Sequence, residues 1–197
     1  AYGPGLGGGE LKADLQEFAG LLLLDADGLN RLAAQGDVQP WLRQRRGPTW
    51  LTPHAAEFQR LFPELAALPP HQAASQAAQQ SQCWVLRKGA RTLIASPDGT
   101  VRQLLQSDAR AARAGLGDVL SGYAAGLGAM GLASGLHPTD DRFDGLLALA
   151  ALAHATAGIR QSQAGEGAAS PLAIAQTLQN AKNADICEQA EIGLKHK

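Results

Sequence analysis

Features that would place this chain in an obvious class are scarce in its sequence. It has two cysteines, Cys83 and Cys187, whose wide separation matches no metal site, and this favours two reduced thiols in a cytoplasmic protein. Lys and Arg number 17 against 18 Asp and Glu, which gives a formal net charge of −1. With so little net charge, we expect neither nucleic acid nor an anionic membrane surface as a partner.

Long apolar segments are missing as well. The longest stretch, residues 145–153, is far shorter than the roughly 20 residues that a membrane-spanning helix needs. No basic-then-apolar leader opens the sequence. Because 45% of the 197 residues are hydrophobic, the chain can still bury a substantial core. We therefore expect one soluble, cytoplasmic domain over residues 1–197.

Short apolar runs alternate with helical patterns along the first half of the chain. A leucine run at 21–24 ends at Asp25, as expected for a buried parallel strand whose carboxyl end presents acids to a ligand. Further strands are expected at 49–51 and 83–86, with a crossover helix over 69–82. Thr52 and Pro53 are expected to cap and begin the helix that follows the second strand.

The pattern changes after the third strand. Residues 92–95 and 101–105 flank Ser-Pro-Asp-Gly-Thr, which is typical of a tight hairpin turn. Gly122 and Gly126 predict close packing of a helix against a neighbour. The order of elements indicates an α/β fold with a mostly parallel sheet and an antiparallel hairpin. Three helices complete it, one beginning at Asp118, one over 144–159 and largely buried, and one over about 171–184.

The most informative segment is Gly-Leu-Gly-Asp at 115–118, which precedes an apolar run. A helix that starts here presents unpaired backbone N–H groups and the positive end of its dipole, and both bind phosphate. Asp118 would then act on a group beside that phosphate. Glycine next to an acid is also an ordinary helix start, so the segment alone leaves both interpretations open.

Four other segments accompany it in a fixed order. They are Gly-Pro-Gly-Leu-Gly at 3–7, Asp-Ala-Asp-Gly-Leu-Asn at 25–30, Leu-Thr-Pro-His-Ala-Ala-Glu-Phe at 51–58 and Leu-Arg-Lys-Gly-Ala-Arg-Thr at 86–92. Together the five segments resemble those of the ADP- or ATP-dependent NAD(P)H-hydrate dehydratases, a repair-enzyme branch of the ribokinase-like fold. The resemblance runs from Gly3 to about Ala175 and implies a three-layer ribokinase-like sandwich.

The resemblance also implies an activity, that of a hydro-lyase. Such an enzyme would use ADP or ATP, with Mg²⁺, to dehydrate (6S)-NAD(P)H-hydrate to NADH or NADPH, and the bacterial branch prefers ADP. Asp118 would deprotonate the added hydroxyl so that it accepts a phosphoryl group, after which phosphate leaves and the double bond returns. No resident protein-bound metal is implied, and His137 and His154 are expected to be structural.

Site residues carry over position by position. The resemblance places a nucleotide at Lys88, Gly89, Ala90, Arg91, Thr92, Gly115, Leu116 and Gly117. It places the hydrated dinucleotide at Gly5, Gly7, His54, Glu57 and Asp118. Taken alone, Lys88 is also compatible with a solvated strand end, and His54 and Glu57 with a helix cap. Asp25 and Asp27 are compatible with a magnesium or substrate site and, equally, with a helix cap.

Some features depart from the family pattern. Leu116 replaces a small hydroxyl residue and Arg91 a glycine, and the resemblance implies roughly one further third of the domain ahead of Gly3. In many bacterial relatives an epimerase domain precedes that part, and family members often form tetramers.

Two other functions therefore remain open. One is a related hydroxyethylthiazole- or pyridoxal-type kinase, and the other is a catalytically impaired nucleotide-binding domain.

Overall fold

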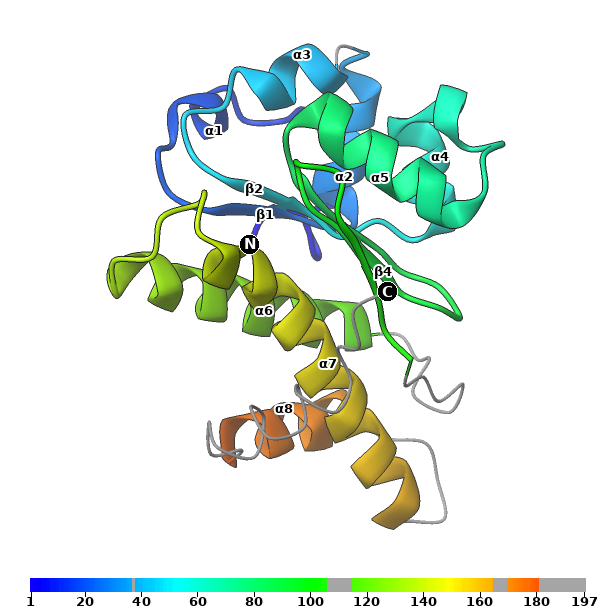
Figure 1. The fold of residues 1–197 in the computed structure, drawn as a ribbon, viewed down its shortest axis with the longest axis vertical. Helices are drawn as coiled ribbons and strands as arrows, with labels where there is room; N and C mark the ends of the chain where they lie inside the picture. The colour runs from blue at the N-terminus through cyan, green and yellow to red at the C-terminus, as the bar shows by residue number, and fades with distance from the viewer. Residues whose placement is uncertain (37, 106–114, 165–169, 181–197) are drawn as a thin grey trace.

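A central sheet of five short strands organises the molecule (Figure 1). The structure, a computed structural model, describes residues 1–36, 38–105, 115–164 and 170–180. Strands β1, β2 and β3 run parallel, whereas β4 and β5 are antiparallel to their neighbours, in the order β1-β2-β3-β4-β5. Their bounds are Leu22–Leu24, Thr49–Leu51, Trp84–Arg87, Leu93–Ala95 and Val101–Gln103. The predicted mixture of a parallel sheet and an antiparallel hairpin is confirmed.

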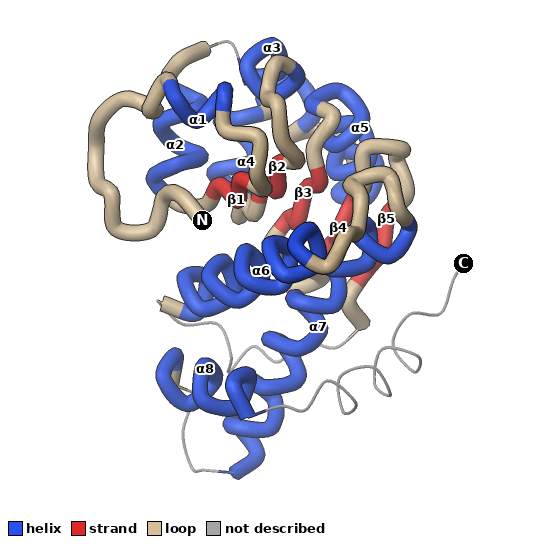
Figure 2. The backbone as a smooth tube through the Cα atoms, turned by 90° about the vertical axis from the view of Figure 1, so that its left-hand side faces the viewer, coloured by secondary structure: helices blue, strands red, loops and turns tan. Residues whose placement is uncertain are grey.

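Helices cover both faces of this sheet, and they make three layers (Figures 1 and 2). On one face lie α2 (Asp27–Ala34), α3 (Val38–Arg43), α4 (Ala55–Leu61) and α5 (Pro70–Ser81), with the short α1 (Asp14–Glu17) and η1 (Pro63–Leu65). On the other face lie α6 (Leu116–Ala133) and α7 (Asp141–Ala164), and α8 (Pro171–Asn180) packs on both of these helices. None of the helices in the described ranges has both the length and the hydropathy to cross a membrane.

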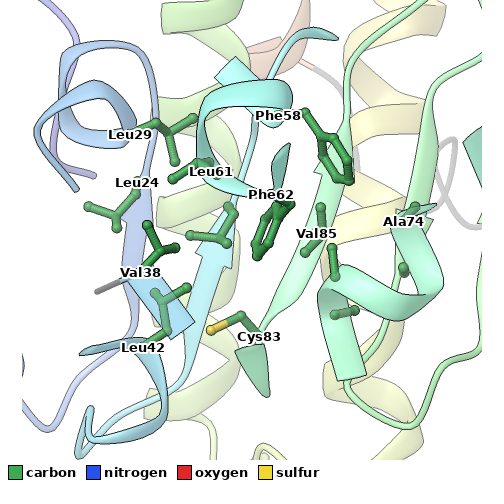
Figure 3. Close-up of a cluster of buried hydrophobic side chains, with 14 of the residues drawn as sticks. Leu24, Leu29, Val38, Leu42, Phe58, Leu61, Phe62, Ala74, Cys83 and Val85 are labelled. Atoms are coloured by element: carbon green, nitrogen blue, oxygen red, sulfur yellow. The ribbon is translucent and has the colours of Figure 1, made fainter. Parts of the chain in front are cut away.

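The two faces of the sheet bury different side chains. Because side chains alternate along a strand, Leu22 and Leu24 join the cluster with α2–α5, which Figure 3 shows, and Leu23 joins the cluster with α6 and α7. Trp50 is fully buried in the second cluster, where its ring centroid lies 5.6 Å from that of Phe143. Burial on both faces explains why β1 is an unbroken leucine run.

The thiol of Cys83 belongs to the first of these cores. It is free and buried beside α3 and α5 (Figure 3), and burial raises its pKa to about 12. A thiol with such a pKa is protonated at neutral pH and unreactive. The burial of Cys83 is consistent with the reduced thiol expected there, which stays a prediction, and Cys187 lies outside the described residues.

Two local predictions about helices are wrong. Helix α4 is capped by His54, with Ala55 as its first residue, in place of the expected cap at Thr52; Thr52 is buried and its hydroxyl instead donates to the carbonyl of Leu24. Gly122 and Gly126 lie on an exposed side of α6, where an added Cβ would meet no atom within 4 Å.

Other glycines bring α6 close to its neighbours. A Cβ at Gly128 would lie 2.3 Å from Leu21 Cδ2 and 2.7 Å from the Trp50 ring, and one at Gly131 would lie 2.5 Å from Leu146 Cδ1. The close packing predicted at Gly122 and Gly126 is instead made by Gly128 and Gly131, which lie on a different side of the helix. Met130, four residues after Gly126, is also exposed. The buried helix predicted at 144–159 is confirmed within α7.

Candidate functional site

The candidate site lies where the parallel strands end. The loops after β1, β2 and β3 follow one another along this edge of the sheet, as the carboxyl ends of parallel strands do. Backbone hydrogen bonds join them, from Thr52 N to Leu24 O (3.1 Å) and from Lys88 N to Pro53 O (2.8 Å). The motifs that follow these three strands therefore share one surface.

A buried carboxylate stands at the centre of this surface. Asp25, directly after β1, is 1% exposed, and its Oδ1 accepts from Lys88 Nζ at 2.7 Å. Its Oδ2 accepts from Ser121 Oγ, on α6, at 2.5 Å, and the Ala26 N–H donates to Oδ1 at 2.9 Å. A Cβ at Gly117 would lie 3.7 Å from Lys88 Nζ and 3.8 Å from Asp25 Oδ2. The structure thus brings three of the predicted motifs together at one side chain.

The first turn of α6 presents the predicted acid to solvent. Gly115 precedes the helix with φ +85°, a left-handed conformation that glycine adopts without strain. Asp118 follows in the first turn and is exposed, whereas Leu116 is 4% exposed and packs with Ala157 and Ile174. The unusual leucine therefore fills the core beneath the turn and keeps its backbone N–H at the helix start.

One histidine lies near this turn. Burial lowers the pKa of His154, on α7, and the neighbouring backbone of Leu116 opposes that shift. Its Nε2 is buried and has no hydrogen-bond partner among the described residues. The structural role expected for His154 stays a prediction, and the residue lies close to the backbone of Leu116 at the start of α6.

The glycine-rich segment at 3–9 is held against the loop after β1. Tyr2 forms a parallel bridge with Leu24, and a Cβ at Gly3 would lie 1.7 Å from the carbonyl oxygen of Asp25. Gly5 and Gly7 are exposed, with φ of +72° and +64°. Glycine is required at residue 3 because no side chain fits, and the segment at 5–9 lies exposed at the surface.

Two side chains of α2 fix this glycine-rich loop. Asp27 Oδ2 accepts from the Gly7 N–H at 2.7 Å, and the Arg31 guanidinium donates to the carbonyls of Leu6, Gly7 and Gly8. The Asp27 side chain therefore holds the glycine-rich loop and does not cap α2. The residue at the cap position is Ala26, which makes no side-chain cap bond. Arg31 was missed in the sequence, although its position four residues after Asp27 places both on one helix face.

His54 and Glu57 form a capping box at the start of α4. His54 Nδ1 accepts from the Ala56 N–H at 3.1 Å, and Glu57 Oε2 accepts from the His54 N–H at 2.8 Å. The Glu57 side chain is 5% exposed, whereas that of His54 is 53% exposed. These contacts support the capping interpretation of Glu57 and leave the His54 ring open to solvent. Substrate contact at either residue stays a prediction.

The loop after Lys88 is exposed at Gly89, Ala90 and Arg91. Thr92 Oγ1 donates to the Gly89 carbonyl at 3.4 Å, which closes a short turn. Arg91 projects from this turn at the surface, so its bulk is accommodated without burial. Within the described ranges, no group of three or more His, Cys, Asp or Glu side chains is placed to hold a metal ion.

Comparison with known proteins agrees with this geometry. The family model described as NAD(P)H-hydrate dehydratase matches residues 1–180. The chain belongs to the NAD(P)H-hydrate dehydratase family. A relative named bifunctional NAD(P)H-hydrate repair enzyme Nnr, from Synechocystis sp., is 43% identical over 167 residues, which are 83% of this chain and 30% of that protein. The family prediction made from the five motifs is confirmed.

Solved structures confirm the fold. An ADP/ATP-dependent NAD(P)H-hydrate dehydratase from Bacillus subtilis, co-crystallised with ATP and Mg²⁺, is 25% identical with a TM-score of 0.55 over 74% of this chain and 50% of that one. A ribokinase-like superfamily protein from Enterococcus faecalis gives a TM-score of 0.67 at 20% identity, over 85% of this chain and 52% of that one. The dehydratase-family chain spans about a quarter to a third of the length of the curated relatives it matches.

Proposed function

We propose that the protein dehydrates (6S)-NAD(P)H-hydrate to NAD(P)H, with ADP or ATP as phosphoryl donor. The observation that carries this proposal is the convergence of Lys88, Gly117 and the first turn of α6, with Asp118 exposed beside them. A cation, a helix start and a free carboxylate are the groups that phosphoryl transfer to a hydroxyl requires.

The chemistry assigned to the site has two steps. Asp118 accepts the proton of the ring hydroxyl as its oxygen attacks the terminal phosphorus, and the bond from phosphorus to the nucleotide oxygen breaks. The C–O bond of the resulting phosphate ester then breaks, with phosphate taking the bonding pair and the ring nitrogen supplying electron density. The adjacent carbon then loses a proton to water, and the C–H bonding pair restores the double bond. The N–H groups from Gly115 to Gly117 stabilise charge on the phosphoryl group.

The nucleotide is assigned to the loop over residues 88–92 and to the start of α6. Lys88 offers an ammonium group to the phosphates, and the exposed backbone of Gly89 and Ala90 lies next to it. ADP is the favoured donor, as the bacterial branch implies, and AMP is then the product. Magnesium enters on the nucleotide phosphates, because hard cations prefer their oxygens and Asp25 is already held by Lys88 and Ser121.

The hydrated dinucleotide is assigned to the neighbouring surface. Gly5 and Gly7 lie on the exposed segment that precedes β1. The exposed His54 ring lies on the loop that follows β2. Since NADH and NADPH serve cytoplasmic enzymes, the proposal includes a cytoplasmic location. Assembly into a homo-oligomer, as the family resemblance implies, is part of the same proposal and is tested by analytical ultracentrifugation.

The decisive experiment follows the near-ultraviolet absorbance of reduced nicotinamide. The whole protein that contains this sequence is mixed with hydrated NADH or NADPH, Mg²⁺ and either ADP or ATP, beside an Asp118→Asn control. Recovery of absorbance that disappears in the variant supports the proposal and identifies the nucleotide. A stable phosphorylated product without recovered absorbance would support a kinase instead. Nucleotide binding without turnover would support the catalytically impaired domain.

A further inference from the structure

Asp25 is a buried charge with an unusual set of partners. Three donors reach its two oxygens: the N–H of Ala26 in the same loop, and the side chains of Lys88 and Ser121, which are distant in the sequence. A carboxylate that is 1% exposed is unstable unless it is paired and hydrogen-bonded. Lys88 therefore has a fixed electrostatic partner in the folded protein.

This partner restricts where the ammonium group can go. A lysine side chain has four rotatable carbon–carbon bonds and samples many positions when it is free. The bond of 2.7 Å to Asp25 Oδ1 selects one of them, with Nζ close to Gly117. The Lys88 side chain nevertheless remains 24% exposed, so its other N–H donors can still meet a ligand at the surface.

Ser121 extends the same restriction to α6. Its hydroxyl lies one turn after Gly117 and donates to the second oxygen of Asp25. The carboxylate therefore sets the distance between the ammonium group of Lys88 and the N–H groups at the start of the helix. A bound phosphate group would contact the ammonium group and these N–H groups at the same time.

We propose that Asp25 is a positioning residue of the nucleotide site, which holds Lys88 in register with the first turn of α6. The inference rests on the proposed function, because it assumes that a nucleotide phosphate lies between these groups. Asp25 itself acts through Lys88 and makes no contact with the ligand. It is distinct from Asp118, which is exposed and acts on the hydroxyl.

A second carboxylate in the same chain provides a matched control. Asp144, on α7, accepts from Trp84 Nε1 at 2.5 Å, Ser96 Oγ at 2.7 Å and Arg102 Nη1 at 2.8 Å. It also pairs with a cation, a serine and an N–H group. It contacts Trp84, the first residue of β3, whereas Lys88 follows the last residue of that strand. Removing the Asp144 carboxylate therefore measures how much the loss of such a cluster destabilises the fold at a position away from the candidate site.

The test compares equilibrium binding of ADP with Mg²⁺ to the wild type, Asp25→Asn, Ser121→Ala and Asp144→Asn, with folding checked by circular dichroism. We expect Asp25→Asn to raise the Kd for ADP about tenfold or more and Ser121→Ala about threefold, on the scale of lost charge-assisted and neutral hydrogen bonds. Asp144→Asn is expected to lower the melting temperature without changing the Kd. Because Ser121→Ala removes a single hydroxyl, it keeps the test valid if Asp25→Asn does not fold.

Combining substitutions identifies the route of the effect. If Asp25 acts through Lys88, then Asp25→Asn added to Lys88→Met raises the Kd no further than Lys88→Met alone. Wild-type ADP affinity in folded Asp25→Asn and Ser121→Ala would overturn the inference while leaving the proposed function intact. Equal losses of affinity in Asp25→Asn and Asp144→Asn would also overturn it, because they would indicate a general structural effect. Failure of the wild type to bind ADP would overturn both proposals.

Discussion

The loop after β1 and the first turn of α6 each bring one carboxylate to the same edge of the sheet, under opposite conditions. Asp25 is buried and accepts three hydrogen bonds, two of them from side chains distant in sequence. Asp118 is exposed at a helix start. A carboxylate held by a lysine and a serine is suited to fix geometry, whereas an exposed one is free to take a proton from a ligand. In the proposed function, Asp25 therefore positions Lys88, and Asp118 accepts the proton.

The largest expected effect comes from removing the exposed carboxylate. We expect Asp118→Asn to lower kcat by about 10² to 10⁴, the usual contribution of a general base, while the free energy of unfolding changes by less than about 0.5 kcal/mol because the side chain is exposed. Steady-state kinetics and chemical denaturation measure the two quantities. Asp141→Asn, at an exposed acid in the first turn of α7, is the control and should leave both unchanged. Retained activity in Asp118→Asn would remove the contrast between the two carboxylates.

A smaller effect, on stability, is expected from adding a methyl group against the backbone of Asp25. Gly3→Ala places a Cβ 1.7 Å from the Asp25 carbonyl oxygen at φ +140°, so the backbone must move. We expect a loss of about 2 to 4 kcal/mol in the free energy of unfolding, within the range of severe single substitutions. Gly5→Ala, with open space around it at φ +72°, should lose only about 1 kcal/mol. Equal losses in urea denaturation would show that Gly3 is not packed against Asp25.

Stability should respond to pH through the histidine near the start of α6. Burial lowers the pKa of His154 below its ordinary value of 6.5, so the unfolded chain binds a proton more readily than the folded one. Its contribution to stability is therefore complete above about pH 6.5 and is lost as the pH falls below that value. We expect the melting temperature of His154→Gln to decline less between pH 7 and pH 5 than that of the wild type. Parallel declines would show that other groups cause the acid sensitivity.

The smallest effect is expected on the exposed side of α6. Gly122→Ala adds a methyl group where no atom lies within 4 Å, and it should raise the free energy of unfolding by about 0.5 to 1 kcal/mol through helix propensity. Gly128→Ala, whose Cβ would meet Leu21 and Trp50, should lower it. Thermal denaturation of the two variants distinguishes the sides. Destabilisation by Gly122→Ala would restore the prediction that this glycine packs closely.

Much of the sheet follows from local patterns. The leucine run before Asp25 and the apolar residues before Thr52 and Lys88 predicted β1, β2 and β3, because strands covered on both faces are apolar throughout. The turn composition at 96–100 predicted the β4–β5 hairpin. These signals depend on neighbouring residues, so they are visible in a single sequence.

The contacts between side chains of the site could not be predicted from such local patterns. Ser121 lies inside the apolar pattern of a helix, and nothing local distinguishes it from a serine that faces solvent. Its role depends on how α6 docks on the sheet, as does the choice of Gly128 over Gly122 for close packing. The start of α4 was placed at Thr52 because a threonine followed by proline is a common capping pair, whereas the capping interpretation of His54 and Glu57, which the sequence had left open, is the one that the structure supports.

The bond from Ser121 to Asp25 joins residues 96 positions apart, and this separation has a consequence for the order of folding. Contacts between distant residues form late, because a long loop must close first. Until α6 docks, the charge at the end of β1 lacks one of its partners and remains better solvated by water than by protein. We therefore expect the docking of α6 to complete the proposed nucleotide site. A partly folded chain, by the same argument, is expected not to bind the nucleotide.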